Sequence, residues 1–192
     1  MLYVFLADGF EECEAVAPID MLRRADCEVI TVKVGGRPDD KKVMGSHDIE
    51  VAADINESEI NESEINDLSA LKMIVLPGGA AGVEKLYASE SVEQIIKYCV
   101  DKKIPVGAIC AAPSILARRG YLKDVKSTAH PLFRHYLTEG GAVLEETEKV
   151  ITDGIFTTAA AAGVSTEFGL ELVRVLKGDD VAKKIGEQIL LY

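Results

Sequence analysis

Short runs of apolar, β-rich residues recur along the chain, and each is followed by a stretch with helical spacing. The strand-like runs lie at 2–7, 27–34, 72–79 and 104–110. The helical stretches lie at 13–25, 91–103 and 113–119. Strands that are apolar on both faces and alternate with helices are typical of βαβ units. The pattern therefore predicts an α/β fold with a mostly parallel sheet and helices on both faces.

The remaining segments predict hairpins and closing helices. A hairpin or edge pair is expected near Gly45, and an Asp-Gly turn within residues 149–159 predicts a second hairpin. Helices are expected at 163–176 and 179–190, the second capped by Asp179. A chain of 192 residues suits one compact domain, so residues 1–192 are interpreted as a single domain.

One stretch, "INESEINESEIN" at residues 55–66, repeats a five-residue unit in tandem. Solenoids need longer units and at least three copies. We interpret the segment as a local duplication that lengthens an acidic surface helix or loop, with an acidic functional segment as the alternative.

Charge and the first residues exclude several classes of partner. The formal net charge of the chain is −11. Nucleic acids and anionic membranes bind proteins through basic surfaces, so we expect neither as a partner. The apolar run that ends at Ala7 has no basic residue before it and acids soon after it. This is neither a signal peptide nor a membrane span, and a cytoplasmic location is expected. The four cysteines lack paired C-x-x-C spacing, so we expect free thiols and no structural metal.

The stretch "GAICAAPS" at residues 107–114 places Cys110 among small residues. A nucleophile elbow requires small residues two positions to either side, here Ala108 and Ala112, because strand and helix backbones nearly touch there. A thiol at the start of the following helix is expected to have a lowered pKa. The alternative is that Cys110 serves only in packing, because cysteine is among the most buried residue types.

Three further residues or motifs are expected near Cys110, because loops at the carboxyl ends of parallel strands meet at one edge. "LPGG" at 76–79 offers backbone amides for an oxyanion site. Glu14 falls among apolar positions of the first helix, where burial would raise its pKa and suit it to proton transfer. Glu11 and Glu12 are interpreted as ordinary helix-start acids. His130, which precedes a proline, is a weaker candidate.

In this order, "FLADGFEECEAVAPIDMLRRA", "VLPGG", "GAICAAPSILA" and "TAHPL" resemble the DJ-one/ThiJ/PfpI superfamily, most closely its short branch. The resemblance implies a flavodoxin-like three-layer sandwich with a cysteine nucleophile elbow, and a homodimer. It implies Cys110, Glu14 and His130 as the catalytic residues. Backbone amides are implied for Gly78, Gly79 and Ala111. Asp20 and Arg24 are implied to approach the dimer boundary beside the site. We hypothesise that Cys13 lies near Cys110 or near its counterpart in the dimer.

The function implied is a cofactor-independent enzyme, of hydro-lyase or hydrolase type, that acts on reactive carbonyls. The class includes glutathione-independent conversion of methylglyoxal to lactate, and protein deglycation would draw on the same chemistry. The alternatives are a redox-sensing protein of oxidative stress with an oxidisable Cys110, and a chaperone-like binding dimer. A metal held by Glu14, Cys110 and His130 is a minor alternative, and we expect none.

Three positions depart from family patterns. Ala111 stands where the protease-like branch has a histidine, which argues against peptidase activity. His47 stands where a relative has an arginine, so an anion held by that arginine is not expected here. Cys13 adjoins Glu14 and is a hypothetical resolving thiol, the alternative being a small buried hydrophobe.

Overall fold

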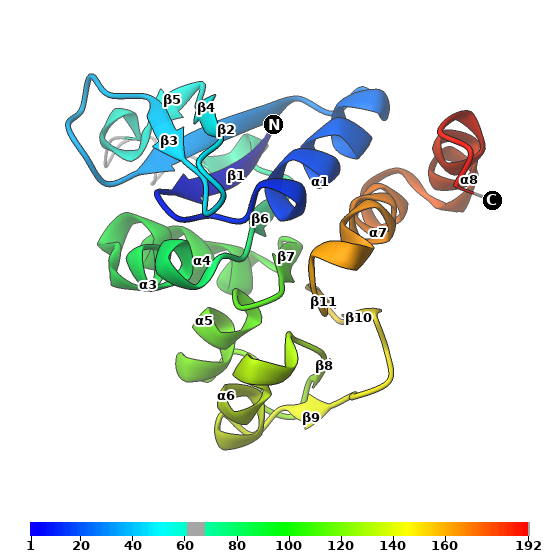
Figure 1. The fold of residues 1–192 in the computed structure, drawn as a ribbon. Coiled ribbons are helices and arrows are strands. Elements are labelled where there is room, and N and C mark those ends of the chain that lie inside the picture. Colours follow the sequence, from blue (N-terminus) through cyan, green and yellow to red (C-terminus); the bar gives the residue numbers. More distant parts are fainter. Residues whose placement is uncertain (61–67, 192) are drawn as a thin grey trace.

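A computed structural model describes residues 1–60 and 68–191. Its centre is a seven-stranded sheet in the order β10-β11-β7-β6-β1-β2-β5 (Figure 1). The strands are β1 (Leu2–Ala7), β2 (Val29–Val34), β5 (Ile55–Asn56), β6 (Ile74–Leu76), β7 (Val106–Ile109), β10 (Val150–Asp153) and β11 (Phe156–Ala159). All neighbours are parallel except the β10–β11 pair. The predicted α/β fold with a mostly parallel sheet is confirmed.

Helices cover both faces of this sheet. On one face, α1 (Glu12–Arg24), α7 (Ser165–Lys177) and α8 (Asp179–Gln188) share an apolar cluster that includes Leu22 and Phe168. On the other face, α3 (Ala80–Ala88), α4 (Glu90–Lys102) and α5 (Pro113–Arg118) share a second cluster. The result is a three-layer sandwich whose central strands β1, β6 and β7 are fully buried.

Smaller elements decorate the rim of the sandwich. The predicted hairpin near Gly45 is β3 (Lys42–Met44) with β4 (Glu50–Ala52), paired antiparallel. A parallel pair, β8 (Lys126–Ser127) and β9 (Val143–Leu144), brackets α6 (Arg134–Glu139). Within the described residues there are four 3-10 turns: η1 (Glu57–Glu59), η2 (Leu68–Ala70), η3 (Pro131–Phe133) and η4 (Ala162–Val164).

Most predicted elements match the structure within a few residues, and two details differ. Asp179 is the first residue of α8 and not its cap, because Gly178 occupies the N-cap position. The duplicated segment begins with strand β5 and the turn η1, so its first half is partly built into the sheet edge. Its second half, from residue 61, lies outside the described residues.

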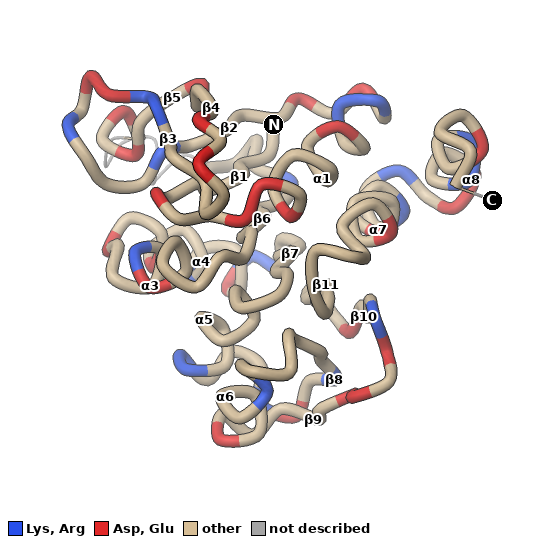
Figure 2. Tube along the Cα trace, viewed as in Figure 1, with Lys and Arg blue, Asp and Glu red and all other residues tan. Residues whose placement is uncertain are grey.

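Charged residues of both signs are distributed over the helices and loops, with acids at the start of α1 and on the β4 side of the β3–β4 hairpin (Figure 2). Within residues 1–60 and 68–191, no helix combines the length and apolar character that crossing a bilayer requires.

Candidate functional site

Three loops at the carboxyl ends of β1, β6 and β7 converge on one edge of the sheet. The β1–α1 loop contacts the β6–α3 loop directly, since the Glu11 N–H donates to the Gly78 carbonyl over 3.0 Å. The N–H of Gly82 donates to the Gly9 carbonyl over 3.3 Å. The loops that the sequence singled out thus meet where an open parallel sheet binds its ligands.

Cys110 follows β7 in left-handed backbone geometry, with φ of 65°. Its N–H donates to the Ala159 carbonyl over 2.8 Å, and its carbonyl accepts from the His130 N–H over 3.0 Å. Left-handed geometry at a residue other than glycine costs on the order of 1–3 kcal/mol, and here it lies in the sharp turn between β7 and α5. The predicted elbow geometry is present, and the half-buried thiol lies at its tip.

The small residues of this stretch are small for separate reasons. Ala108 and Ala112 are fully buried on either side of Cys110. A Cβ at Gly107 would lie 2.8 Å from Leu172 Cδ2 on α7, so this glycine serves helix packing. A Cβ at Gly78 would overlap Glu14 Oε2 and lie 2.7 Å from Cys110 Cβ. Only a residue without a side chain fits between this acid and this thiol.

The three predicted amide donors divide between the two groups. The backbone N–H groups of Ala111 and Gly79 act on the Cys110 sulfur and favour its ionised form. The Gly78 amide instead acts on the Glu14 carboxyl. The Gly79 and Ala111 amides are therefore better placed than the Gly78 amide to stabilise negative charge next to the Cys110 sulfur.

Glu14, in the first turn of α1, is 1% exposed. Its Oε2 makes no hydrogen bond within the described part of the chain. Burial raises the pKa of the Glu14 carboxyl to about 7, against the opposing effects of the nearby Cys110 thiol and the Gly78 and Ala162 amides. The expectation of an inward-pointing carboxyl with a raised pKa is confirmed. Near neutral pH it can both accept and donate a proton.

The expectation of a lowered thiol pKa is wrong. Burial, and then the Glu14 carboxylate, raise the pKa of Cys110 to about 12, and the Ala111 and Gly79 amides only oppose this rise. The six-residue helix α5 begins three residues after Cys110 and supplies no counterweight. Two acidic groups in contact cannot both ionise readily, so the pair loses its first proton near neutrality and Glu14 carries that charge.

His130 lies beside Cys110 through the backbone bond described above. Its Nδ1 accepts the Leu132 N–H over 3.3 Å, at the start of η3. A neutral ring with this nitrogen as acceptor carries its proton on Nε2, which leaves Nε2 as a donor. His130 is thus in the neighbourhood that the resemblance implied.

Asp20, Arg24 and Cys13 lie on α1. Asp20 Oδ2 accepts from Arg24 Nε over 2.8 Å in an exposed i,i+4 pair. Cys13 is exposed, so its interpretation as a buried hydrophobe is wrong. The carboxylates of Glu11, Glu12 and Glu14, together with burial, raise the pKa of the Cys13 thiol, with Glu11 the largest cause. This disfavours a reactive thiolate at Cys13.

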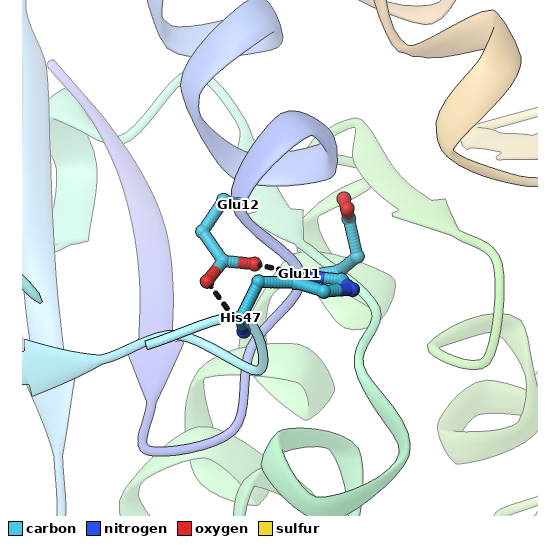
Figure 3. Close-up of side chains that lie close together, drawn as sticks. All are labelled: Glu11, Glu12 and His47. Carbon is cyan, nitrogen blue, oxygen red and sulfur yellow. Dashed lines mark hydrogen bonds and ion pairs between the residues drawn. The ribbon is translucent and has the colours of Figure 1, made fainter. Parts of the chain in front are cut away.

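Sequence reasoning missed the environment of Glu12 and His47. Glu12 is buried, and its two oxygens accept from the His47 N–H at 2.7 Å and from His47 Nδ1 at 2.9 Å (Figure 3). Within the described residues, Glu11, Glu12 and His47 bring ligand-type atoms within 4.8 Å of one another. Glu12 and His47 use these atoms on each other, so we interpret the group as a hydrogen-bonded cluster and not as a metal site. The periodicity of apolar residues gives no signal for such a pair.

Comparison with known proteins gives consistent matches. The model of the DJ-1/PfpI family matches residues 1–175. Protein DJ-1 homolog B of Arabidopsis thaliana is 33% identical over 99% of this chain, which spans 41% of that relative's length. A Schizosaccharomyces pombe protein named glutathione-independent glyoxalase DJ-1 is 30% identical over 92% of this chain and 91% of its own. The crystal structure of Drosophila melanogaster DJ-1beta superposes with a TM-score of 0.89 at 26% identity, covering 98% of this chain and 96% of that one.

Proposed function

The chain belongs to the DJ-1/PfpI family, and from that premise we propose that it is a glutathione-independent glyoxalase that converts methylglyoxal to lactate. The observation that carries the proposal is the buried Glu14 carboxyl, with a pKa raised to about 7, facing Cys110 on its elbow across Gly78. A nucleophile paired with an acid that exchanges protons at neutral pH is the minimum for moving hydrogen between two carbons. The name of the fission yeast relative supports the same chemistry.

The first step is addition of the Cys110 sulfur to the aldehyde carbon. Because the thiol is un-ionised at neutral pH, the Glu14 carboxylate accepts its proton as the carbon–sulfur bond forms. The aldehyde oxygen gains negative charge beside the Ala111 and Gly79 amides, and protonation from Glu14 gives a hemithioacetal. Glu14 is a carboxylate again after this step.

The second step moves hydrogen between the two carbons. The Glu14 carboxylate removes the proton from the former aldehyde carbon, giving an enediolate, and returns it to the neighbouring carbon. The hydroxyl proton of the first carbon passes to the oxygen of the second carbon, so the overall charge is unchanged. The first carbon is oxidised to a thioester and the second is reduced to an alcohol, so no external electron carrier is consumed. Water then cleaves the thioester and restores the Cys110 thiol, with His130 as the second acid–base group. The sum is methylglyoxal plus water giving lactate and a proton.

A homodimer is a further part of the proposal. Val16 is 50% exposed and Ile49 is 56% exposed, and both line one groove of about 710 Å³ with Cys13 and Asp20. A second copy of the chain would cover this apolar surface. Sedimentation of the wild type and of Val16→Asp tests it: a dimer that the substitution dissociates is expected, and a monomeric wild type would contradict it.

Redox sensing is the second candidate, favoured by the half-buried thiol that faces an acid protonated below about pH 7. A protonated Glu14 would donate a hydrogen bond to a sulfinate formed at Cys110. Lactate formation from methylglyoxal without glutathione separates the two functions, with Cys110→Ala and Glu14→Ala as inactive references. Repeated turnover supports the glyoxalase. Consumption of one aldehyde per thiol, without lactate, supports the sensor.

A further inference from the structure

The turn between β3 and β4 is bonded to the first turn of α1 through one carboxylate. Glu12 accepts hydrogen bonds from the His47 N–H and from His47 Nδ1 (Figure 3). It also accepts one from Ser46 Oγ over 3.3 Å. All three donors come from the hairpin turn, 34 or 35 residues further along the chain. Bonds to a charged acceptor are about twice as strong as neutral ones.

The contact between Glu12 and the hairpin turn depends on residues of both the hairpin and α1. Glu12 is 7% exposed, and a Cβ at Gly45 would overlap its carboxylate, so the hairpin approaches closely only because residue 45 is glycine. Two backbone bonds run beside it: Gly9 N–H to the Met44 carbonyl over 2.7 Å, and Ser46 N–H to the Phe10 carbonyl over 2.8 Å. The β1–α1 loop is therefore held by the hairpin on one side and by the Gly78 loop on the other.

Glu14 belongs to the first turn of α1, which is the segment that the hairpin contacts through Glu12. Glu11 caps α1, with its Oε2 accepting the Glu14 N–H over 2.8 Å, while the Glu11 N–H is bonded to the Gly78 carbonyl. Glu12 lies between this cap and Glu14, and its side chain accepts the hydrogen bonds from the hairpin turn. Both oxygens of the Glu12 carboxylate accept hydrogen bonds from the hairpin turn, so this carboxylate is engaged with the hairpin.

We infer that Glu12 is a positioning residue, which bonds the Ser46–His47 turn to the start of α1 and thereby holds the Glu14 carboxyl against Cys110. The inference deepens the proposed function and rests on the role of Glu14 as the base. The general reason for such a contact is that misplacement of a catalytic group by about 1 Å can cost on the order of 100-fold in rate.

The test measures alkylation of Cys110 by iodoacetamide as a function of pH, with the Cys110 peptide followed by mass spectrometry. Because this reaction needs no aldehyde, it reports on the Glu14–Cys110 pair even where methylglyoxal is not the substrate. In the wild type the rate is expected to rise as Glu14 ionises, with an inflection near the pKa of about 7. Glu14→Gln is expected to remove that inflection.

Glu12→Ala is expected to slow Cys110 alkylation at pH 8 by about 10- to 100-fold and to remove or displace the inflection. Glu12→Gln rescues most of the rate, because its amide oxygen still accepts from the His47 N–H. The matched control is Glu50→Gln, which breaks the exposed Lys42–Glu50 ion pair of the same hairpin and leaves the contact with α1 intact. The control is expected to behave as the wild type.

A Glu12→Ala protein that keeps both the wild-type rate and the inflection overturns the inference, as does a Glu14→Gln protein with unchanged alkylation. Circular dichroism establishes that each variant is folded. Where Glu12→Ala does not fold, His47→Ala, which removes only the ring contact, is expected to slow alkylation in the same direction, and no slowing there also overturns the inference. Wild-type protein that yields no lactate while Glu12→Ala still slows alkylation refutes the glyoxalase and supports the positioning role.

Discussion

The Glu14 carboxyl and Cys110 converge on the same face of Gly78, so closely that one methyl group at residue 78 would meet both. They come from different elements: the first turn of α1 and the elbow after β7. Gly78, in the loop after β6, lies between them and leaves space for both because it has no side chain. Each ionisation also depends on the other group, because a charged Glu14 raises the pKa of the Cys110 thiol.

Gly78→Ala is therefore expected to slow lactate formation strongly. Its Cβ would overlap Glu14 Oε2 and press on Cys110 Cβ, so the acid and the thiol must move apart. A displacement of about 1 Å predicts a loss on the order of 100-fold in kcat/KM. Gly163→Ala is the matched control at the same edge of the sheet, since a Cβ there meets nothing within 4 Å. Equal activity of the two variants would refute the close approach of Glu14 and Cys110.

Turnover is expected to rise with pH through about 7. Only the ionised Glu14 accepts the thiol proton and the carbon-bound proton, and burial raises its pKa to about 7. The acid limb of kcat/KM against pH should have its midpoint there, near neutrality and well above 4.5, the ordinary value for glutamate. A limb centred near 4.5 would mean that Glu14 is solvated in the free enzyme.

Glu14→Gln is expected to remove a pH-dependent cost in stability. The folded pKa of about 7 lies above the ordinary 4.5, so the contribution of Glu14 is fully present below pH 4.5 and is lost as the pH rises through 7. The lost free energy of unfolding is about 3 kcal/mol, at about 1.36 kcal/mol per pKa unit. Relative to the wild type, the variant should therefore gain up to about 3 kcal/mol between pH 4 and pH 8.

Urea titrations of both proteins at the two pH values measure this difference. The comparison cancels groups with the opposite behaviour, such as Glu12, whose pKa is lowered to about 2 by its bonds to His47 against the effect of its own burial. An offset between the two proteins that stays constant from pH 4 to pH 8 would show that Glu14 ionises normally in the fold.

The sequence predicts those parts of the site that depend on local pattern. Cys110 stands out because small residues flank it between a strand and a helix, and Glu14 because it interrupts an apolar helix face. Each of these two patterns lies within a single short segment of the sequence. The convergence of their loops follows from the rule that parallel strands place their carboxyl ends together.

What the sequence could not predict depends on contacts between distant segments. In the sequence, Glu12 looks like any acid at the start of a helix. Its partner His47 lies 35 residues further along the chain, and only the folded structure brings the two together. The raised pKa of the Cys110 thiol is not predictable from the sequence for a related reason. The expected helix dipole is a local feature, whereas burial and the Glu14 charge arise only when the layers assemble.

Cys13 is expected to stay out of any disulfide under mild peroxide. The thiolate is the species that peroxide attacks, and Glu11, burial and two further carboxylates raise the pKa of Cys13. Cys110 has a base at hand in Glu14, so oxidation should begin at Cys110 and proceed to sulfinic acid without a Cys13 partner. Non-reducing peptide mapping after limited peroxide treatment measures both outcomes, with Cys13→Ser as the matched variant. A disulfide that contains Cys13, or protection of Cys110 that disappears in Cys13→Ser, would establish Cys13 as a resolving thiol.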